Sequence, residues 1–413
     1  MSYPRFTGAA AIVAAAALLG CESAERTSAS DPSAASIVTT VPSPTGAGAG
    51  EPFLAAGADG SVYLSWLEPV DSAHALKFAR YDGATWSEPR TIRAGRDFFV
   101  NWADFPSIKV VDDGRLAAHW LQKTGPGTYA YGVRVSQSVD GGATWSEPVI
   151  PHRDSSDTEH GFVTLWREGA GMGAVWLDGR KYNKEGHSPT NEMMLVTTTI
   201  GPDGRLGAET RLDERICDCC QTAVAMTANG PVVAYRDRSP DEIRDIYVVR
   251  RVDGGWTTPV AVHADGWKIA ACPVNGPAIA GRESRVALAW FTAAEDSGRV
   301  NVAFSSDAGA TFGPPVRIDE GKPAGRVDVA LLPDGGALVS WIERTGGDTA
   351  AVRVRRVTVD GKTAPPVTIA TSSAARASGF PRMVMRGDDA MFAWTEPGKP
   401  AAIRIAKLSS PGR

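Results

Sequence analysis

Basic residues are not in excess in this chain of 413 residues. Its 43 Lys and Arg are outnumbered by 47 Asp and Glu, which gives a formal net charge of −4 at pH 7. Removing residues 1–20, which hold one Arg and no acid, makes the charge −5. Proteins that bind nucleic acid usually carry a basic patch, so the charge gives no reason to expect a nucleic-acid partner.

Long hydrophobic segments are also scarce, with one exception at the N-terminus. Arg5 precedes the apolar run GAAAIVAAAALLG, which is too short to span a bilayer and is typical of an export signal. The run ends at LLGC, which resembles the processing box of bacterial lipoproteins. That resemblance implies cleavage before Cys21 and lipidation of its thiol, and an ordinary secretory signal is the alternative.

The segment after the signal predicts a tether. Residues 21–35 are rich in Ser and Ala and poor in large apolar side chains, so they cannot bury enough surface to fold alone. Glu22 stands where Asp would be the usual inner-membrane signal, so the lipoprotein resemblance implies an outer-membrane anchor in the cell envelope. We expect a signal peptide over 1–20, a tether over 21–35 and a monomeric folded domain over 36–411.

Helical periodicity is absent from that domain, and a β-pattern repeats instead. Seven times an apolar stretch ends in an aromatic residue followed by polar ones, as in VYLSWLE and MGAVWLD. Four short strands per unit, with a period of 51 to 59 residues, indicate a β-propeller. The repeated aromatics are Trp66, Trp120, Trp176, Tyr235, Trp290, Trp341 and Trp394.

The turn before the last strand of several units carries a motif. SVDGGATW and SSDAGATF fit Ser-x-Asp-x-Gly-x-Thr-aromatic, and shorter or worn copies occur in other units. The motif resembles the Asp box, or bacterial neuraminidase repeat, of the sialidase superfamily. In such a hairpin the Asp accepts backbone N–H groups and the Gly permits positive φ. The Asp-box positions are Asp82, Asp140, Asp253 and Asp307.

The seventh unit ends after three strands. A propeller has to close, and the β-branched segment SIVTTVPS at residues 36–43 precedes the first unit, so we predict that it supplies the missing strand. The predicted fold is all-β, a seven-bladed β-propeller of four-stranded blades whose last blade is closed by an N-terminal strand. Sialidases of the family have six blades, so the count departs from the resemblance.

The longest polar loops belong to blades two to five. Ligands of propellers usually enter at one face, so we predict a glycan site at the rim that these loops form. None of the candidate positions matches a sialidase motif, and the family's Phe-Arg-Ile-Pro segment is missing. The candidate catalytic residues are Asp178, Asp237 and Tyr182, and the candidate substrate-binding residues are Arg180, Arg236, Arg238, Trp267 and Lys268.

Asp178 and Asp237 also belong to a repeated position, two residues after each aromatic, where five of seven residues are acidic. Strand alternation puts this position on the same face of every blade. One interpretation is structural: the acids pair with neighbours such as Arg180, Arg238 and Arg344, or accept loop amides. The other is that two of them act as acid and base on a neutral glycoside.

The sequence has no motif for Ser-His-Asp catalysis, phosphate binding or a His-rich metal site. The cysteines are the remaining candidates for special chemistry. Cys217 and Cys272 each lie 18 residues before a repeat aromatic, so the CDCC segment and Cys272 should meet between adjacent blades. Two disulfides among Cys217, Cys219, Cys220 and Cys272 are one interpretation. A thiolate site for Cu(I) or Zn, or a redox-active pair, is the other.

The sequence therefore favours a sialidase-like, lipid-anchored propeller that binds or acts on glycans, as an exo-glycosidase if it is an enzyme. A non-catalytic binding or scaffold propeller is the alternative, and a metal or redox role of the cysteines is the third. The expected partners are a glycan or another small ligand, and the membrane that receives the lipid. No cofactor is expected for the leading hypothesis.

Overall fold

The computed structural model describes residues 37–112, 114–182 and 192–409. The predicted signal, lipidated Cys21 and tether lie outside these residues. Within the described part, no helix has the length and apolar character needed to cross a membrane. The two short helical turns there are η1 (Ala294–Asp296) and η2 (Arg376–Ser378), and the rest of the regular structure is β-strand.

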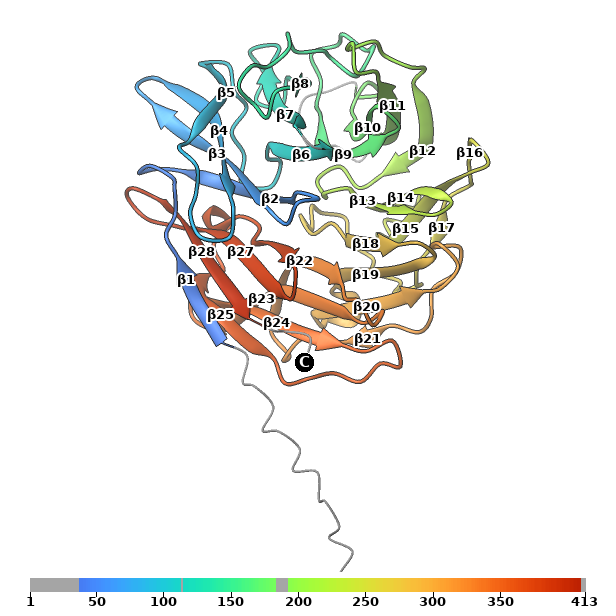
Figure 1. The fold of residues 1–413 in the computed structure, drawn as a ribbon. Helices are drawn as coiled ribbons and strands as arrows, with labels where there is room; N and C mark the ends of the chain where they lie inside the picture. Colours follow the sequence, from blue (N-terminus) through green and yellow to red (C-terminus); the bar gives the residue numbers. More distant parts are fainter. Residues whose placement is uncertain (1–36, 113, 183–191, 410–413) are drawn as a thin grey trace, which may run out of the picture. The chain divides into compact units, whose positions relative to one another are not determined.

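Seven antiparallel sheets follow one another along the chain and form the blades of a propeller (Figure 1). The innermost strands are β2 (Gly50–Ala56), β6 (Ser107–Asp112), β9 (His160–Glu168), β13 (Ala223–Thr227), β18 (Ala278–Arg282), β22 (Pro323–Leu331) and β26 (Arg382–Arg386). The second strands are β3 (Val62–Val70), β7 (Arg115–Lys123), β10 (Gly171–Asp178), β14 (Gly230–Arg236), β19 (Arg285–Thr292), β23 (Ala337–Gly346) and β27 (Asp389–Glu396).

The third and outer strands complete the sheets. The third strands are β4 (Ala73–Tyr81), β8 (Tyr131–Ser138), β11 (Met193–Ile200), β15 (Ile246–Val252), β20 (Arg299–Ser305), β24 (Thr349–Val357) and β28 (Ala402–Ser409). The outer strands are β5 (Arg90–Gly95), β12 (Thr210–Ile216), β16 (Gly255–Trp256), β17 (Val260–Ala261), β21 (Val316–Arg317), β25 (Val367–Ser373) and β1 (Ile37–Val41). In blade 2 the outer position is reduced to a single bridge between Val135 and Val149.

The predicted seven-bladed fold and its closure are confirmed. Each repeat aromatic lies on the second strand of its blade, and Trp66, Trp176 and Trp290 are fully buried. β1 pairs antiparallel with β28, from Ile37 opposite Ser409 to Val41 opposite Ile405, and so becomes the outer strand of blade 7. Consecutive innermost strands contact one another, and β2 contacts β26, so the ring closes.

The hairpins whose sequence resembles an Asp box have the predicted hydrogen bonds in the two full copies of the motif. Asp140 accepts from Thr144 N at 2.9 Å and from Thr144 Oγ1 at 2.6 Å. Asp307 accepts from Thr311 in the same way, at 2.9 and 2.6 Å. The shorter copy is similar, because Asp82 accepts two backbone N–H groups at 2.8 Å. Asp253, in a worn copy, forms no carboxylate hydrogen bond with the described chain.

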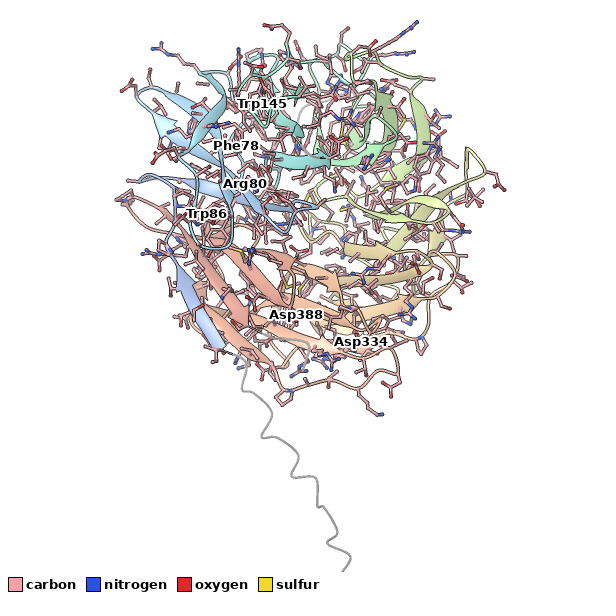
Figure 2. The ribbon with its side chains drawn as sticks, viewed as in Figure 1. Phe78, Arg80, Trp86, Trp145, Asp334 and Asp388 are labelled. Atoms are coloured by element: carbon pink, nitrogen blue, oxygen red, sulfur yellow. The ribbon has the colours of Figure 1, made fainter. Side chains whose placement is uncertain are left out.

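The two hairpins with the full motif also contact the preceding blade. The ring of Trp145, after the blade 2 hairpin, meets the edge of Phe78 on β4 with centroids 6.0 Å apart (Figure 2). A Cβ atom on Gly142 would lie 2.3 Å from Phe78, and one on Gly309 would lie 3.1 Å from Val232 of blade 4. Glycine is therefore needed at these turns for close blade contact as well as for positive φ.

Candidate functional site

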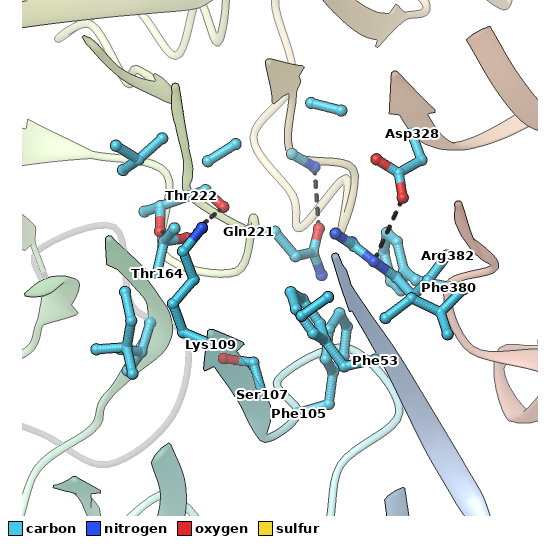
Figure 3. Close-up of a pocket in the computed structure, with 18 of the residues that line it drawn as sticks. Phe53, Phe105, Ser107, Lys109, Thr164, Gln221, Thr222, Asp328, Phe380 and Arg382 are labelled. Carbon is cyan, nitrogen blue, oxygen red and sulfur yellow. Dashed lines mark hydrogen bonds and ion pairs between the residues drawn. The ribbon is translucent and has the colours of Figure 1, made fainter. Parts of the chain in front are cut away.

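The innermost strands surround a cavity of about 350 Å³ (Figure 3). All seven of them contribute residues to its wall, from Phe53 on β2 to Met383 on β26. Residues of the connections that lead into blades 2, 4, 5 and 7 line it as well. A cavity of this size, with apolar walls and a few polar groups, is where small ligands of folded proteins usually bind.

Lys109 is the cation of this cavity that lacks a counter-ion. It lies on β6, and Figure 3 draws its amino group on the same side of the pocket as Thr164 and Thr222, which bond to each other. Within the described residues Lys109 forms no hydrogen bond or ion pair, and burial lowers its pKa. Lys109 is half-buried in the wall, and because an ammonium without a counter-ion is unfavourable there, the cavity favours a ligand that carries negative charge.

The second cation of the cavity is already neutralised and stacked. Arg382 lies 3.4 Å from the Asp328 carboxylate. Its guanidinium also lies over the rings of Phe53, at 4.7 Å, and Phe105, at 5.9 Å. Phe105 in turn contacts Phe380, with ring centroids 5.8 Å apart. The result is an aromatic wall between blades 7, 1 and 2, with flat faces against which a ring-shaped ligand could pack.

Gln221 braces the connections that lead into three blades. Its Nε2 donates to Ala103 O at 2.7 Å, and its Oε1 accepts from Gly276 N at 3.1 Å. A Cβ atom on Gly276 would lie 2.1 Å from Gln221 O, so a larger residue does not fit there. Since both ends of the amide are occupied by backbone groups, Gln221 shapes the cavity wall and has little capacity left for a ligand.

Three buried side chains share hydrogen bonds beside the cavity. The Tyr131 hydroxyl lies 2.7 Å from Asp104 Oδ2 and 2.7 Å from Glu159 Oε1. One hydroxyl proton serves one acceptor at a time, so this arrangement is most favourable when a carboxyl is protonated. Burial raises the pKa of Asp104 to about 7 and the pKa of Glu159 to about 8. Asp104 also lines the cavity, so a group able to exchange protons near neutral pH lies at its wall.

The sequence analysis missed these residues. Lys109 carried a signal, since it is the lysine in the otherwise apolar start of the strand SIKVV. Asp104, Tyr131 and Glu159 belong to different connections and strands and share no motif. The glycine that lets them meet is Gly161, because a Cβ atom there would lie 2.0 Å from Asp104 Oδ2.

Asp178, a predicted catalytic acid, is enclosed in an ion pair. Its carboxylate is fully buried, accepts from Trp176 Nε1 at 2.9 Å and pairs with Arg180 Nη2 at 2.6 Å. Burial opposes ionisation, but these bonds hold the pKa of Asp178 below its ordinary value. Arg180 also contacts Glu209 at 3.2 Å. This geometry supports the structural interpretation of the repeated acid.

Asp237, the second predicted acid, has a different environment. Arg238, one of the neighbours named for the structural interpretation, forms an ion pair with Glu242 at 2.8 Å. The hydroxyl of Tyr235, which replaces the repeat Trp, donates to Asp213. Burial, and then the charge of Asp213, raise the pKa of Asp237 to about 7.

The remaining rim candidates do not form one exposed cluster. Arg236 is 1% exposed, donates to the carbonyls of Asn275, Arg244 and Phe291, and lies 4.9 Å over the ring of buried Trp267. Lys268 is exposed on the surface. Tyr182 is partly buried against the cysteine-containing core cluster, where burial and the charges of Asp218 and Glu159 raise its pKa.

The CDCC segment and Cys272 do meet between blades 4 and 5, as predicted. Cys272 Sγ lies 3.8 Å from Asp218 Oδ1. Cys217 Sγ lies 3.8 Å from Cys219 Sγ and 3.2 Å from Cys220 Sγ, well beyond the about 2.05 Å of a disulfide. None of the four cysteines in the described chain forms a disulfide, so the two predicted disulfides are not confirmed.

Comparisons with known proteins agree with the fold. No protein-family model matches the chain, and no curated protein matches its sequence. Among solved structures, the polysaccharide lyase Uly1 is 10% identical with a TM-score of 0.51, over 85% of this chain and 88% of that chain. A GH93 α-L-arabinofuranosidase of Fusarium graminearum is 13% identical with a TM-score of 0.50, over 74% and 92%.

A sialidase of Trypanosoma rangeli also matches, with 14% identity and a TM-score of 0.47, over 87% of this chain and 60% of that chain. The lyase and the arabinofuranosidase are, by their names, enzymes that act on glycans. At these identities the likeness defines the class of fold, a β-propeller shared with glycan-active enzymes.

Proposed function

We propose that the protein binds an acidic glycan in the channel cavity and cleaves its terminal linkage, with Asp104 as the acid–base group. Tyr131 and Glu159 are positioning residues in this proposal, because they act on the ligand through Asp104. The observation that carries the proposal is the unpaired Lys109 ammonium in a cavity of about 350 Å³. The carboxylate or sulfate of an acidic sugar would supply its missing counter-ion.

Asp104 fits the second part of the proposal. In hydrolysis of a glycosidic bond, the C–O bond to the leaving group breaks and water forms a new bond to the anomeric carbon, so a group must give a proton to the leaving oxygen at working pH. A carboxyl with a pKa of about 7 is about half protonated at neutral pH, whereas an ordinary Asp is almost fully ionised. The solved neighbours named above act on glycans, by their names, and so support this ligand class.

The binding test compares two lysines. Isothermal titration with uronate-containing, sulfated and neutral oligosaccharides should show binding of the acidic ligands and not of the neutral ones. Lys109→Met should weaken that binding about tenfold or more, since it removes a charged contact in a buried site. The matched control is Lys268→Met, which removes an exposed rim lysine and should change nothing. Loss of binding in the control alone would move the site to the predicted rim.

The turnover test compares two acids with similarly raised pKa values. Panels of aryl glycosides and acidic polysaccharides should show cleavage by the wild-type chain. Asp104→Asn should abolish it, and Tyr131→Phe should shift the pH profile. Asp237→Asn should retain activity, because Asp237 does not line the cavity although its pKa is also about 7. Binding without turnover in every case would instead support the non-catalytic binding propeller.

We also propose that Cys21 carries the lipid anchor implied by the LLGC segment. The full-length precursor, expressed in a bacterium, should partition into detergent and incorporate labelled fatty acid. Cys21→Ala should do neither and should accumulate uncleaved. A soluble, processed Cys21→Ala protein would show an ordinary secretory signal instead.

A further inference from the structure

Three cysteine sulfurs converge in the loop between β12 and β13. Cys217, Cys219 and Cys220 are 1%, 7% and 2% exposed, and their Sγ atoms all lie within 4.8 Å of one another. No pair is at bonding distance, since the Cys217 sulfur lies 3.8 and 3.2 Å from the other two. All three sulfurs therefore remain available as ligands.

Their separations suit three ligands around one metal ion. A metal–sulfur bond of about 2.3 Å puts the sulfurs of a planar trigonal site about 4 Å apart. The observed separations differ from this value by less than about 1 Å, which side-chain rotation can supply. Because the three residues lie within four positions of one loop, binding requires no movement between blades.

A positive charge is already in place beside the sulfurs. Arg244 is buried, and its Nη1 lies 3.3 Å from Cys217 Sγ and 3.0 Å from Asp218 Oδ1. Burial opposes ionisation of Cys217, yet bonds from the other two thiols and the charge of Arg244 hold its pKa well below its usual range. Thiolates are the form that binds metals, and a nearby guanidinium offsets the negative charge of a thiolate complex.

The number of protein ligands at the site distinguishes between zinc and Cu(I). Structural zinc sites are almost always four-coordinate. In the described part of the chain, no fourth Cys, His, Asp or Glu donor lies within 4.8 Å of all three sulfurs; Asp218 and Cys272 form a separate group with Cys219. Three sulfurs in a buried site fit Cu(I), a soft ion that accepts three thiolates. We propose that Cys217, Cys219 and Cys220 bind one Cu(I) ion.

Binding of Cu(I) to the thiols releases protons and involves no oxidation or reduction. Each thiol that becomes a ligand releases its proton to solvent, and copper remains in the +1 state. Oxidation of the Cys217–Cys220 pair to a disulfide would remove two of the ligands, so the test starts from reduced protein kept without oxygen.

The first experiment needs no variant. The full mature chain is titrated with Cu(I) in competition with the chromophoric chelator bicinchoninate, and the loaded protein is examined by X-ray absorption at the copper edge. We expect one Cu(I) per chain, three sulfur neighbours at about 2.3 Å, and retention of copper against excess Zn(II). A chain that fails to compete for Cu(I), or an ion with a fourth protein ligand, would overturn the proposal.

The second experiment assigns the ligands. Cys217→Ser, Cys219→Ser and Cys220→Ser should each weaken Cu(I) binding about 100-fold or more, with circular dichroism confirming the fold. Cys272→Ser is the matched control, because it removes a neighbouring thiol outside the trio and should retain the stoichiometry. Arg244→Gln should weaken binding about tenfold, as expected for a partner of a ligand. Equal loss in Cys272→Ser would contradict the assignment.

This proposal does not depend on the glycan proposal. The copper titration contains no glycan, and the ligand panel can be repeated on metal-free protein. Failure of one proposal would therefore leave the other unaffected.

Discussion

Blades 3 and 4 place an aspartate at the same repeat position, with opposite results. In blade 3 the Asp178 carboxylate is enclosed by the Trp176 indole and Arg180, and its pKa is lowered. In blade 4 Tyr235 replaces the tryptophan, and burial together with Asp213 raises the pKa of Asp237 to about 7. The indole N–H and the arginine, rather than the position itself, decide whether the acid is ionised.

The arrangement in blade 3 recurs elsewhere in the ring. Trp66 Nε1 donates to Glu68 at 2.9 Å in blade 1, and Trp341 Nε1 donates to Glu343 at 2.6 Å in blade 6. The acid two residues after the aromatic is thus part of the blade's construction in these blades. A repeated polar residue in a propeller is first a structural element, and departures from the repeat are the better indicators of special chemistry.

The largest effect is expected for Asp178→Ala. The substitution leaves a buried indole N–H without its acceptor and removes the nearer of the two acidic partners of Arg180, so the free energy of unfolding should fall by about 4 kcal/mol. Urea unfolding followed by tryptophan fluorescence measures this. Glu396→Ala is the control, because Glu396 occupies the same repeat position in blade 7 but forms an exposed pair with Arg404, which should be worth less than about 1 kcal/mol. Equal losses would contradict the comparison.

Asp237→Asn should have a smaller and pH-dependent effect. The folded pKa of Asp237, about 7, lies above the ordinary value of 3.8, so the folded chain holds a proton that the unfolded chain releases between these pH values. The wild type therefore loses stability as pH rises from about 4 through 7, and the amide variant does not. Relative to wild type, Asp237→Asn should gain stability as pH rises from 4 to 8, at a rate approaching about 1.4 kcal/mol per pH unit between the two pKa values. A pH-independent difference would show that Asp237 titrates normally.

The smallest effect is expected for the aspartate of the hairpin motif, which is also repeated from blade to blade. Asp307→Ala removes hydrogen bonds to Thr311 and should cost about 1 kcal/mol, as for the loss of a capping side chain. Asp253→Ala, in the worn copy of blade 4, should leave the thermal midpoint unchanged. A similar drop in both variants would indicate that the hairpin bonds are not what distinguishes the copies.

The fold was predictable because its signals are local and repeated. Aromatic spacing identified seven blades, and the unfinished seventh unit indicated that residues 36–43 would complete it. The candidate site was not predictable in the same way. Asp104, Tyr131 and Glu159 come from separate segments and meet through hydrogen bonds that no spacing encodes. Sequence order also could not show that Arg236 and Trp267 would bury each other.

The closing strand has a consequence for how the chain is made. Ile37 pairs with Ser409, so this pair cannot form until 372 further residues have been synthesised after Ile37. Blades 1 to 6 can form during synthesis, whereas β1 has no partner strand until β28 has been made. A truncated product therefore carries an unpaired sheet edge, the feature that promotes aggregation and degradation. Chains that include β28 can pair this edge and close the ring, and chains that end before β28 cannot.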